Sequence, residues 1–391
     1  MTTTGIQSRI PRVAILVDTS TGWGRRLIRG VVGYMRKHGE WNLWVRACGQ
    51  DEHIRLPQGW TGEGIIARVP DDPTARHVAA AGVPVVNVSG IELREEGFCR
   101  VTTDLRATGR LAAEHLLDCG LQHFAYAALP RLAYVQHQYQ GFADTLRQAG
   151  HSCPNYQPSF APNSRKRWAT QERELAKWLK SLPKPVGILT WATMLGRQLI
   201  EGCQQIGLHV PEEVAIVGGD YDELLCETCM PSMSGVAVPS EQVGYEAALH
   251  LDRLMRGEPA PDGPILIEPQ GVVARHSTDI LAIEDEDLAN AIRFIRDRAA
   301  EPIEVADVLE AVAISRRRLE RGFEKVLGRS PAAEIRRRHV EQAKRLLTET
   351  DMQIPDVAEA SGFGSATYFT YIFHREVGLS PLKYRTSTRA R

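Results

Sequence analysis

The chain of 391 residues lacks any run of about 18 apolar residues, so no segment is predicted to cross a membrane as a helix. Its first residues lack the basic and then apolar stretches of a signal peptide, and we expect a cytoplasmic protein. It lacks the GxxxxGKS/T, GxSxG and HExxH motifs, and Gly22-x-Gly24 lacks the third glycine of a dinucleotide fingerprint. We therefore expect no catalytic residues and no cofactor.

Cysteine is scarce as well. There are seven cysteines, an odd number, which favours reduced thiols over a disulfide framework. Cys226 and Cys229 form one Cys-x-x-Cys pair, but no second pair stands at the spacing of a structural zinc site. We expect no metal.

Charge is nearly balanced over the whole chain, with a net value of −1. From Ser315 to Arg391, however, there are 16 Lys and Arg against nine Asp and Glu, a net charge of +7, so the preceding residues carry −8. A basic carboxyl-terminal segment on an acidic body predicts a polyanionic partner for that segment alone.

Short apolar runs alternate with amphipathic stretches up to about residue 270, which predicts βαβ units and parallel sheets. The expected strands are Arg12–Val17, Asn42–Ala47, Gly64–Val69, Pro84–Ser89, Phe124–Leu129, Val186–Trp191, Val214–Gly218 and Ser234–Val238. The expected helices between them are Trp23–Lys37, Leu105–Cys119, Tyr139–Ala149, Arg173–Ser181, Arg197–Ile206 and Glu241–Arg256.

The repetition of this pattern predicts two α/β lobes. We expect one sensing domain over residues 1–280, with lobe 1 over 12–104, lobe 2 over 105–235 and a crossover over 234–277 that completes both lobes. The acidic run Glu284–Asp287 precedes an expected helix, Leu288–Arg298, which belongs to a second domain over residues 281–391.

The second domain repeats one helical pattern twice, over Val305–Leu327 and Ile354–Val377. In the first copy Ser315 can cap a helix whose buried stripe is Leu319, Phe323 and Leu327. Arg317 and Arg321 lie opposite that stripe, flanked by Arg316 and Arg318. Such guanidinium groups bind phosphate or guanine; the alternative is an ordinary solvated helix face.

In the second copy Ser365 caps and Phe369, Phe373 and Val377 form the stripe. Gly362 stands where the turn requires a positive φ, or simply where the first helix stops. The outward residues are less basic and would contact bases through hydroxyl groups and van der Waals surfaces; they are Thr367, Tyr368, Thr370, Tyr371 and His374.

A continuous helical pattern over Pro331–Thr348, containing Arg336, Arg337 and Arg338, joins the copies. Its 18 or so residues make a rod of about 27 Å. With the flanking turns, this length suits two recognition helices in successive major grooves, about 34 Å apart. The repeat therefore predicts binding to double-stranded DNA.

The stretch IPDVAEASGFGSATYFTYIFHREVGLSPLKYR, Ile354–Arg385, resembles the signature of the AraC/XylS family of transcription regulators. The resemblance implies base contacts by Arg317 and Arg321 on the first helix and by Thr367 and Tyr371 on the second. The family usually carries an arginine where Tyr371 stands.

The body resembles the LacI/GalR sensor fold, which is similar to periplasmic sugar-binding proteins. Three segments carry this resemblance: Val101–Ala127, Gly141–Gly150 and Val210–Cys226. Together the resemblances imply a homodimeric activator of genes for the breakdown of a pentose-like sugar, with an operator and RNA polymerase as partners.

Asp220 follows the strand Val214–Gly218, at the carboxyl end where parallel sheets bind ligands. We expect it to accept hydrogen bonds from sugar hydroxyls, with Arg25 as a donor from lobe 1. Further candidates are Asp222, Asp104, Trp23, Trp191 and Gln136. Each aspartate could instead cap a helix, and each tryptophan could be core.

Two departures bear on the ligand. Ala192–Thr193 stands where the family generally has Asn-Asp, and Gln136 and Gln138 stand where relatives often have arginine. Both change which polar groups a ligand must match, so the identity of the sugar stays open.

Three classes of function remain. The first is an effector-responsive, sequence-specific DNA-binding transcription regulator. The second is an α/β enzyme acting on a sugar or nucleotide, and the third is a sugar-binding module whose tail contacts proteins.

Overall fold

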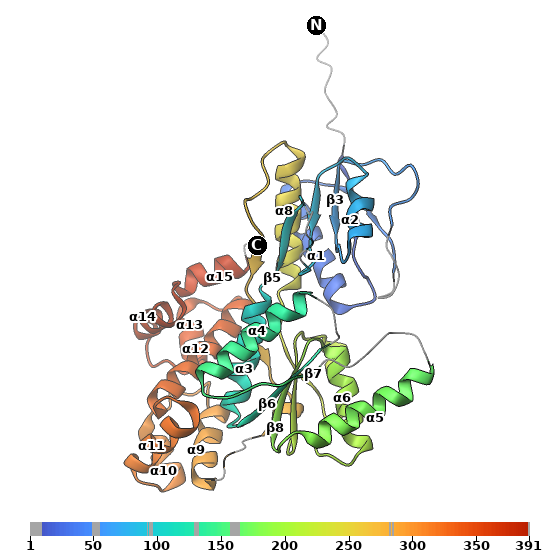
Figure 1. Cartoon of the computed structure of the whole chain (residues 1–391). Coiled ribbons are helices and arrows are strands. Elements are labelled where there is room, and N and C mark those ends of the chain that lie inside the picture. The colour runs from blue at the N-terminus through green and yellow to red at the C-terminus, as the bar shows by residue number, and fades with distance from the viewer. Residues whose placement is uncertain are drawn as a thin grey trace.

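The computed structural model describes residues 10–48, 55–91, 93, 97–128, 133–156, 165–280, 283 and 285–389. It contains two α/β lobes and a helical domain (Figure 1). The expected fold class, an α/β sensor of two Rossmann-like lobes followed by an all-α domain with two helix-turn-helix units, is confirmed.

Lobe 1 is built on a parallel sheet with the strand order β11-β5-β4-β3-β1-β2. Its strands are β1 (Arg12–Leu16), β2 (Asn42–Val45), β3 (Gly64–Ala67), β4 (Val85–Asn87), β5 (Cys99–Thr103) and β11 (Ile265–Ile267). The helices α1 (Gly22–His38) and α8 (Ser240–Met255) cover one face, and α2 (Asp72–Ala79) packs on the other. The central strands are apolar on both sides because both faces are buried.

Lobe 2 has the strand order β12-β10-β9-β8-β6-β7, parallel except for β12 against β10. Its strands are β6 (His123–Ala127), β7 (Asn155–Tyr156), β8 (Val186–Thr190), β9 (Val214–Gly218), β10 (Ser234–Val236) and β12 (Val272–Val273). The helices α3 (Leu105–Asp118) and α4 (Ala133–Gln148) cover one face. The other face is covered by α5 (Arg165–Ser181), α6 (Thr193–Gln205) and α7 (Glu223–Glu227).

The chain crosses between the lobes three times, after β5, after β10 and after β11. These crossings place the carboxyl ends of both sheets toward the space between the lobes. This is the edge at which open α/β sheets bind ligands.

Glycines allow the helices of each lobe to pack closely in pairs. A Cβ atom on Gly109 of α3 would lie 2.0 Å from the carbonyl oxygen of Gln138, and one on Gly141 of α4 would lie 2.0 Å from that of Arg106. Gly30 and Gly244 play the same part between α1 and α8. The α3–α4 pair therefore behaves as one rigid body.

The helical domain contains two hydrophobic clusters, one for each helix-turn-helix unit. Its helices are α9 (Glu286–Asp297), α10 (Val305–Val312), α11 (Arg316–Leu327), α12 (Pro331–Glu349), α13 (Ile354–Ala360), α14 (Ala366–Val377) and α15 (Pro381–Arg389). Gly362 has φ 79°, as expected for the turn before α14. A Cβ atom there would also lie 2.5 Å from the carbonyl oxygen of Glu301.

Several elements differ from the expectation. The strands β5, β7, β11 and β12 and the helices α2 and α7 were not predicted, and α4, α5 and α6 begin earlier than their apolar periodicity suggested. β5 has the sequence CRVTT, whose polar residues do not resemble a buried strand. It is buried because it lies between β4 and β11 in the sheet. The expected strand end Leu129 and the acidic residue Glu284 lie outside the described residues.

We predict that Gly109→Ala lowers the free energy of unfolding by about 1–3 kcal/mol, because the new methyl group forces α3 and α4 apart. Urea denaturation followed by circular dichroism measures this. Gly263→Ala is the matched control, since a Cβ atom there meets nothing within 4 Å. Equal stability of the two variants would show that the helix pair is not tightly packed.

Candidate functional sites: an interlobe cavity and two exposed helices

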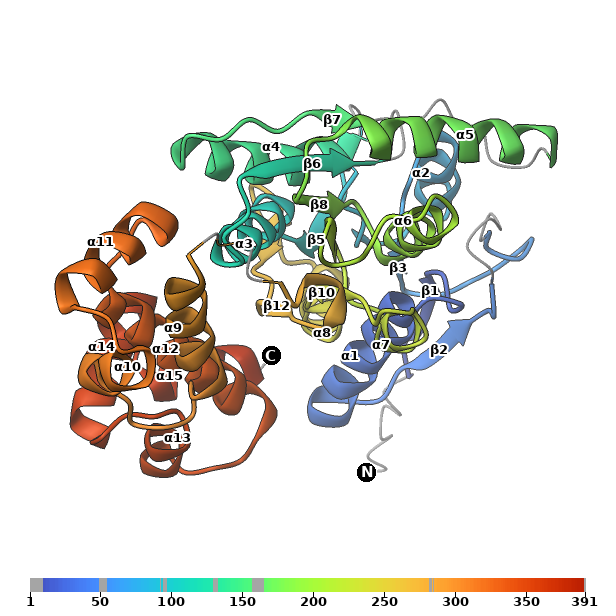
Figure 2. The same ribbon diagram turned by 90° about the horizontal axis from the view of Figure 1, so that it is seen from below.

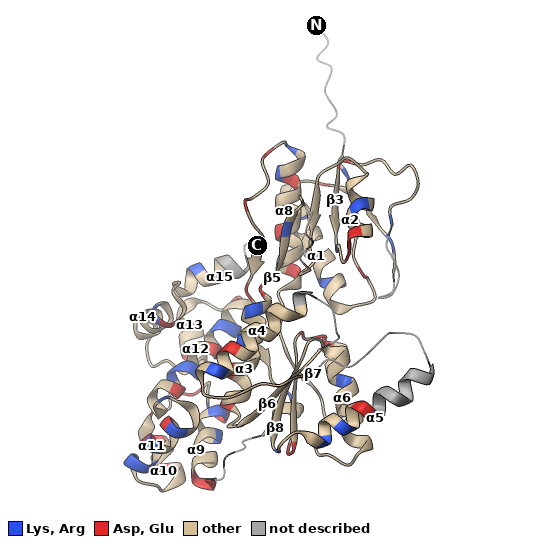
Figure 3. Cartoon of the chain, viewed as in Figure 1, with Lys and Arg blue, Asp and Glu red and all other residues tan. Residues whose placement is uncertain are grey.

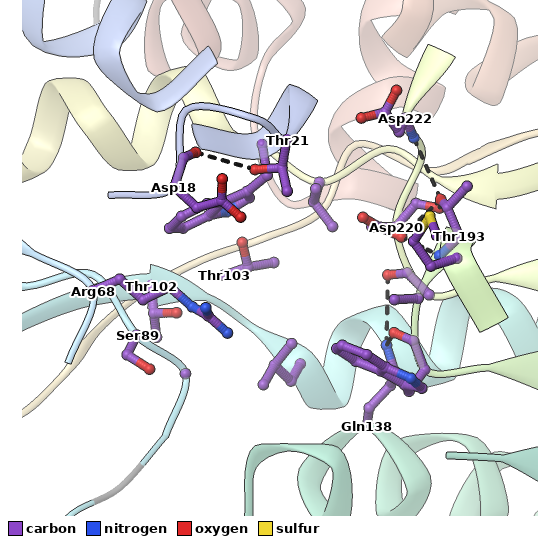
Figure 4. Close-up of a pocket in the computed structure, with 18 of the residues that line it drawn as sticks. Asp18, Thr21, Arg68, Ser89, Thr102, Thr103, Gln138, Thr193, Asp220 and Asp222 are labelled. Atoms are coloured by element: carbon purple, nitrogen blue, oxygen red, sulfur yellow. Dashed lines mark hydrogen bonds between the residues drawn. The ribbon is translucent and has the colours of Figure 1, made fainter. Parts of the chain in front are cut away.

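A cavity of about 200 Å³ lies between the two lobes, and Figure 4 shows its polar side chains. Lobe 1 and lobe 2 face each other across it, with Asp18 and Arg68 on one side and Asp220, Thr193 and Gln138 on the other. The remaining lining residues are Thr21, Trp23, Val88, Ser89, Gly90, Thr102, Thr103, Leu105, Trp191, Ala192, Met194, Gly219, Asp222, Leu225 and Val238.

Asp18 directly follows the apolar run of β1 and is only 6% exposed. Its Oδ1 atom accepts hydrogen bonds from the backbone N–H of Ser20 (2.8 Å) and from its hydroxyl (2.7 Å). Its Oδ2 atom is buried, and no described residue donates a hydrogen bond to it. A buried carboxylate oxygen without a donor is costly, so this atom is prepared to accept from a ligand.

Arg68 follows β3 and turns its side chain toward the cavity (Figure 4). Among the described residues its guanidinium group has no hydrogen-bond or ion-pair partner. Within the described residues, lobe 1 thus offers a ligand the Oδ2 atom of Asp18 as an acceptor and the guanidinium group of Arg68 as a donor.

The lobe 2 wall is more fully hydrogen-bonded. The Oδ1 atom of Asp220 accepts from the backbone N–H of Thr193 (2.6 Å) and from its hydroxyl (2.8 Å). Burial raises the pKa of Asp220 above its ordinary value, although the two hydrogen bonds from Thr193 oppose the shift. Gln138 donates to the carbonyl oxygens of Trp191 (3.4 Å) and Gly219 (3.5 Å), which fixes its side chain.

Two hydrogen bonds join the lobes beside the cavity. The Oδ2 atom of Asp222 accepts from the backbone N–H of Gly22 at the start of α1 (2.9 Å). The guanidinium group of Arg26 donates to the carbonyl oxygen of Tyr221 (3.1 Å). The two lobes therefore touch each other beside the cavity.

Four of the residues predicted for this site line the cavity: Asp220, Asp222, Trp23 and Trp191. Three others do not line it. Arg25 donates to the carbonyl oxygens of Thr19 (3.1 Å) and Ser20 (2.6 Å) and so turns back onto its own loop. The carboxylate of Asp104 caps α3 by accepting from Ala107 N–H.

Gln136 is exposed, whereas Gln138 lines the cavity. Two positions along a helix correspond to a rotation of about 200°, so only one of these side chains can face inward. Sequence reasoning missed Asp18, Arg68 and Thr193. Asp18 follows a buried strand just as Asp220 does, so the same rule could have found it.

The first exposed helix, α11, begins as expected, with the Ser315 hydroxyl accepting from Arg318 N–H (3.3 Å). Arg316 pairs with Glu320 (3.0 Å), and Arg318 pairs with Asp285 (3.1 Å) and with Asp287 (2.9 Å).

Arg317 and Arg321 of α11 are exposed and have no partner among the described residues. Figure 3 shows that basic residues recur along α11 and α12. The two arginines opposite the buried stripe are thus the two that remain available to an anion.

The second exposed helix, α14, is capped by Ser365, which accepts from Tyr368 N–H (3.2 Å), and it buries Phe369 and Phe373. The predicted contact residues Thr367, Tyr368, Tyr371 and His374 are all exposed. Its one arginine, Arg375, pairs with Glu376 (2.6 Å) and lies over the ring of Tyr371. This helix therefore presents hydroxyl groups and aromatic edges but no unpaired arginine.

Cys226 is buried and Cys229 is half-buried, both as free thiols, and no metal-binding cluster occurs among the described residues. No helix in the described part of the chain is both long and apolar enough to span a bilayer.

Comparison with known proteins supports both units. Residues 113–278 match the model of a periplasmic binding protein-like domain, and residues 308–387 match that of a helix-turn-helix domain. The chain is 29% identical over 384 residues to the xylose operon regulatory protein of Escherichia coli (strain K12), covering 96% of each chain. It is 28% identical over 384 residues to the protein of that name from Haemophilus influenzae, covering 96% of this chain and 98% of the relative.

Among solved structures, the xylose-binding transcription activator xylR superposes with a TM-score of 0.63 at 28% identity, covering 97% of this chain and 99% of that one. The similarity thus extends over both domains in the same order. The chain is a periplasmic-binding-protein-like sensor domain joined to an AraC-type helix-turn-helix domain, and it is similar over nearly its whole length to the xylose operon regulatory proteins.

Proposed function

We propose that this protein is an effector-responsive, sequence-specific DNA-binding transcription regulator that acts as a homodimer in the cytoplasm and activates genes of sugar breakdown. The single observation that carries the proposal is the pairing pattern on α11. Arg317 and Arg321 are exposed and have no partner in the described part of the chain, whereas the flanking Arg316 and Arg318 form ion pairs with acidic residues. Unpaired guanidinium groups on a capped, exposed helix suit guanine edges and phosphates in a major groove.

The two recognition helices are proposed to contact successive major grooves of one duplex. α12 has 19 residues and is therefore about 28 Å long, which suits this spacing. Arg317 and Arg321 of α11 would contact one half-site, and Thr367, Tyr368, Tyr371 and His374 of α14 the other. Ser315 and Ser365, which cap the two helices, would lie next to phosphates.

The effector is proposed to be a monosaccharide, with a pentose as the first candidate. A cavity of about 200 Å³ is small beside the roughly 300–1,000 Å³ of sites for drug-sized ligands. Carboxylates, Arg68 and hydroxyl groups provide the acceptors and donors that sugar hydroxyls require, and the indoles of Trp23 and Trp191 can stack on a sugar face. The regulators called xylose-binding or xylose operon proteins support this class.

The mechanism we propose is a population shift. A sugar held by both lobes stabilises the closed arrangement that the Gly22–Asp222 and Arg26–Tyr221 hydrogen bonds already favour. It can change DNA binding only by the difference between its affinities for the closed and open forms. RNA polymerase is the proposed further partner of the DNA-bound dimer.

The proposal is tested by selecting duplexes from a random pool with the full chain. Their affinity is then measured over a range of salt concentrations, with and without D-xylose, L-arabinose and D-ribose. A regulator yields one preferred sequence, an affinity that falls steeply with salt, and a response to a sugar. Turnover of a sugar without any selected duplex would instead establish the enzyme alternative.

Arg317→Ala should weaken binding to the selected duplex by about 1–3 kcal/mol and relax the preference at one base position. Arg316→Ala is the matched control on the same helix, since Arg316 is already paired with Glu320, and it should change affinity little. Fluorescence anisotropy with selected and random duplexes measures both. An equal loss on random DNA would make Arg317 a phosphate contact.

Asp18→Asn should weaken sugar binding at least about tenfold, because the asparagine side chain puts an NH2 donor where the buried Oδ2 acceptor of Asp18 lies. Asp104→Asn is the control, since Asp104 caps α3 and does not line the cavity. Calorimetric titration with the responsive sugar gives both affinities. Unchanged binding by Asp18→Asn would remove this residue from the site.

Asp220→Asn should stabilise the sugar-free protein at neutral pH but weaken the response to the sugar. Burial raises the pKa of Asp220 above its unfolded-state value, so the ionised form costs stability that increases between the unfolded-state pKa and the folded-state pKa. The gain over wild type in melting temperature should be absent below about pH 3, grow as the pH rises from the unfolded-state pKa of about 4 to the folded-state pKa, and level off above that value. A pH-independent loss of stability would contradict this.

A further inference from the structure

A cluster of charged side chains lies between lobe 2 and the helical domain. Asp118, at the end of α3, is 6% exposed and is the sensor domain's contribution. Its carboxylate contacts three arginines of the helical domain: Arg329, Arg337 at 2.5 Å and, at the margin, Arg338 at 3.9 Å.

The helical domain supplies the other acidic groups. Glu334, only 1% exposed, accepts from Arg337 (2.8 and 3.0 Å) and Arg338 (2.8 Å) and lies 2.9 Å from the Nε atom of Arg329. Burial alone would raise the pKa of Glu334, but the three arginines outweigh it and hold the pKa at about 2. Glu341 contacts Arg337 at 2.5 Å.

The charges of this cluster balance only when the two domains are docked. On the helical domain, three arginines face Glu334 and Glu341, which leaves one positive charge over. Asp118 of lobe 2 neutralises it. Leaving a buried charge without its partner is strongly unfavourable, so the cluster favours this one docked arrangement.

Among the described residues of lobe 2, none forms a hydrogen bond or an ion pair with the Asp118 carboxylate. Asp118 is the last residue of α3, where the helix dipole is negative and an acidic side chain is unfavourable. A further ion pair between the domains, Arg296 with Asp279 at 3.6 Å, is peripheral, since the Asp279 side chain is 70% exposed. Asp118 is thus stabilised by the arginines of the helical domain and is unfavourable for its own helix.

The opposite end of α3 reaches the cavity, where Leu105 is a lining residue. The helix has 14 residues and spans about 20 Å between cavity and cluster. It is locked to α4, which carries Gln138 of the cavity wall, by the close contacts at Gly109 and Gly141. Figures 1 and 2 both show α3 beside the helical domain.

We propose that Asp118 anchors the helix-turn-helix domain to lobe 2, and that α3 transmits a change in the cavity to the recognition helices through this anchor. The transmission rests on the proposed function of the cavity and of α11 and α14. The anchor itself rests only on the contacts of Asp118.

Hydrogen–deuterium exchange on the full chain tests the anchor without sugar or DNA. Asp118→Asn should raise exchange about tenfold or more at residues 114–119 of α3 and 331–341 of α12, and leave the strands of lobe 1 unchanged. Asp279→Asn, the matched control, removes an exposed acidic partner of the same domain and should change exchange less than about twofold. Unchanged exchange in Asp118→Asn overturns the anchor.

Two further variants separate loss of the contact from misfolding. Asp118→Glu keeps the charge and should retain most of the protection. Asp118→Arg alone should lose it, and combining Asp118→Arg with Arg329→Asp should recover part of it by reversing one ion pair. No recovery in the double variant, with both domains folded by circular dichroism, contradicts a direct contact.

Transmission is tested with the selected duplex and the responsive pentose. In Asp118→Asn the affinity for the sugar should stay within about twofold of wild type, while the ratio of duplex affinities with and without sugar falls to about one. A wild-type ratio overturns transmission. If the wild-type chain binds no sugar and no duplex, the proposed function and the transmission both fail, while the exchange data still decide the anchor.

Discussion

Two buried carboxylates of lobe 2 contact other parts of the chain. Asp222 accepts a hydrogen bond from Gly22 of lobe 1, and Asp118 contacts arginines of the helical domain. Burying a charge is unfavourable unless a partner is held in place. These contacts favour the observed arrangement of the three parts of the chain, because separating the parts removes a partner from one of these carboxylates.

A third buried carboxylate, Asp18, is left incomplete. One of its oxygens accepts from Ser20, and the other is buried in the cavity wall with no donor among the residues that the structure describes. A sugar hydroxyl can supply that donor, so the ligand completes a polar wall that the protein leaves open. Thr193 hydrogen-bonds Asp220 through its hydroxyl group and adds no charge of its own to the cavity wall. Among the described residues, the cavity-lining side chains Asp18 and Arg68 of lobe 1 therefore keep an acceptor and donors without partners.

The general plan could be predicted from the sequence because it depends on periodicity. Alternating strands and helices predicted two lobes, and two serine-capped helices with aromatic or leucine stripes predicted the helix-turn-helix units. Details that depend on tertiary contacts could not be predicted in this way. β5 is polar in sequence, Gln136 and Gln138 differ only in helix phase, and Arg25 is drawn onto its own loop by two carbonyl groups. The sequence also does not distinguish Arg337 and Arg338 of α12, which contact Asp118 of lobe 2, from the exposed arginines of α11.

The central claim is that the cavity and the recognition helices are thermodynamically coupled in one chain. It is tested most directly on the wild-type protein by measuring duplex affinity with and without saturating sugar, and sugar affinity with and without saturating duplex. The account predicts the same factor in both directions, about fivefold or more, because coupling between binding sites is reciprocal. Affinities that do not change in either direction would contradict it.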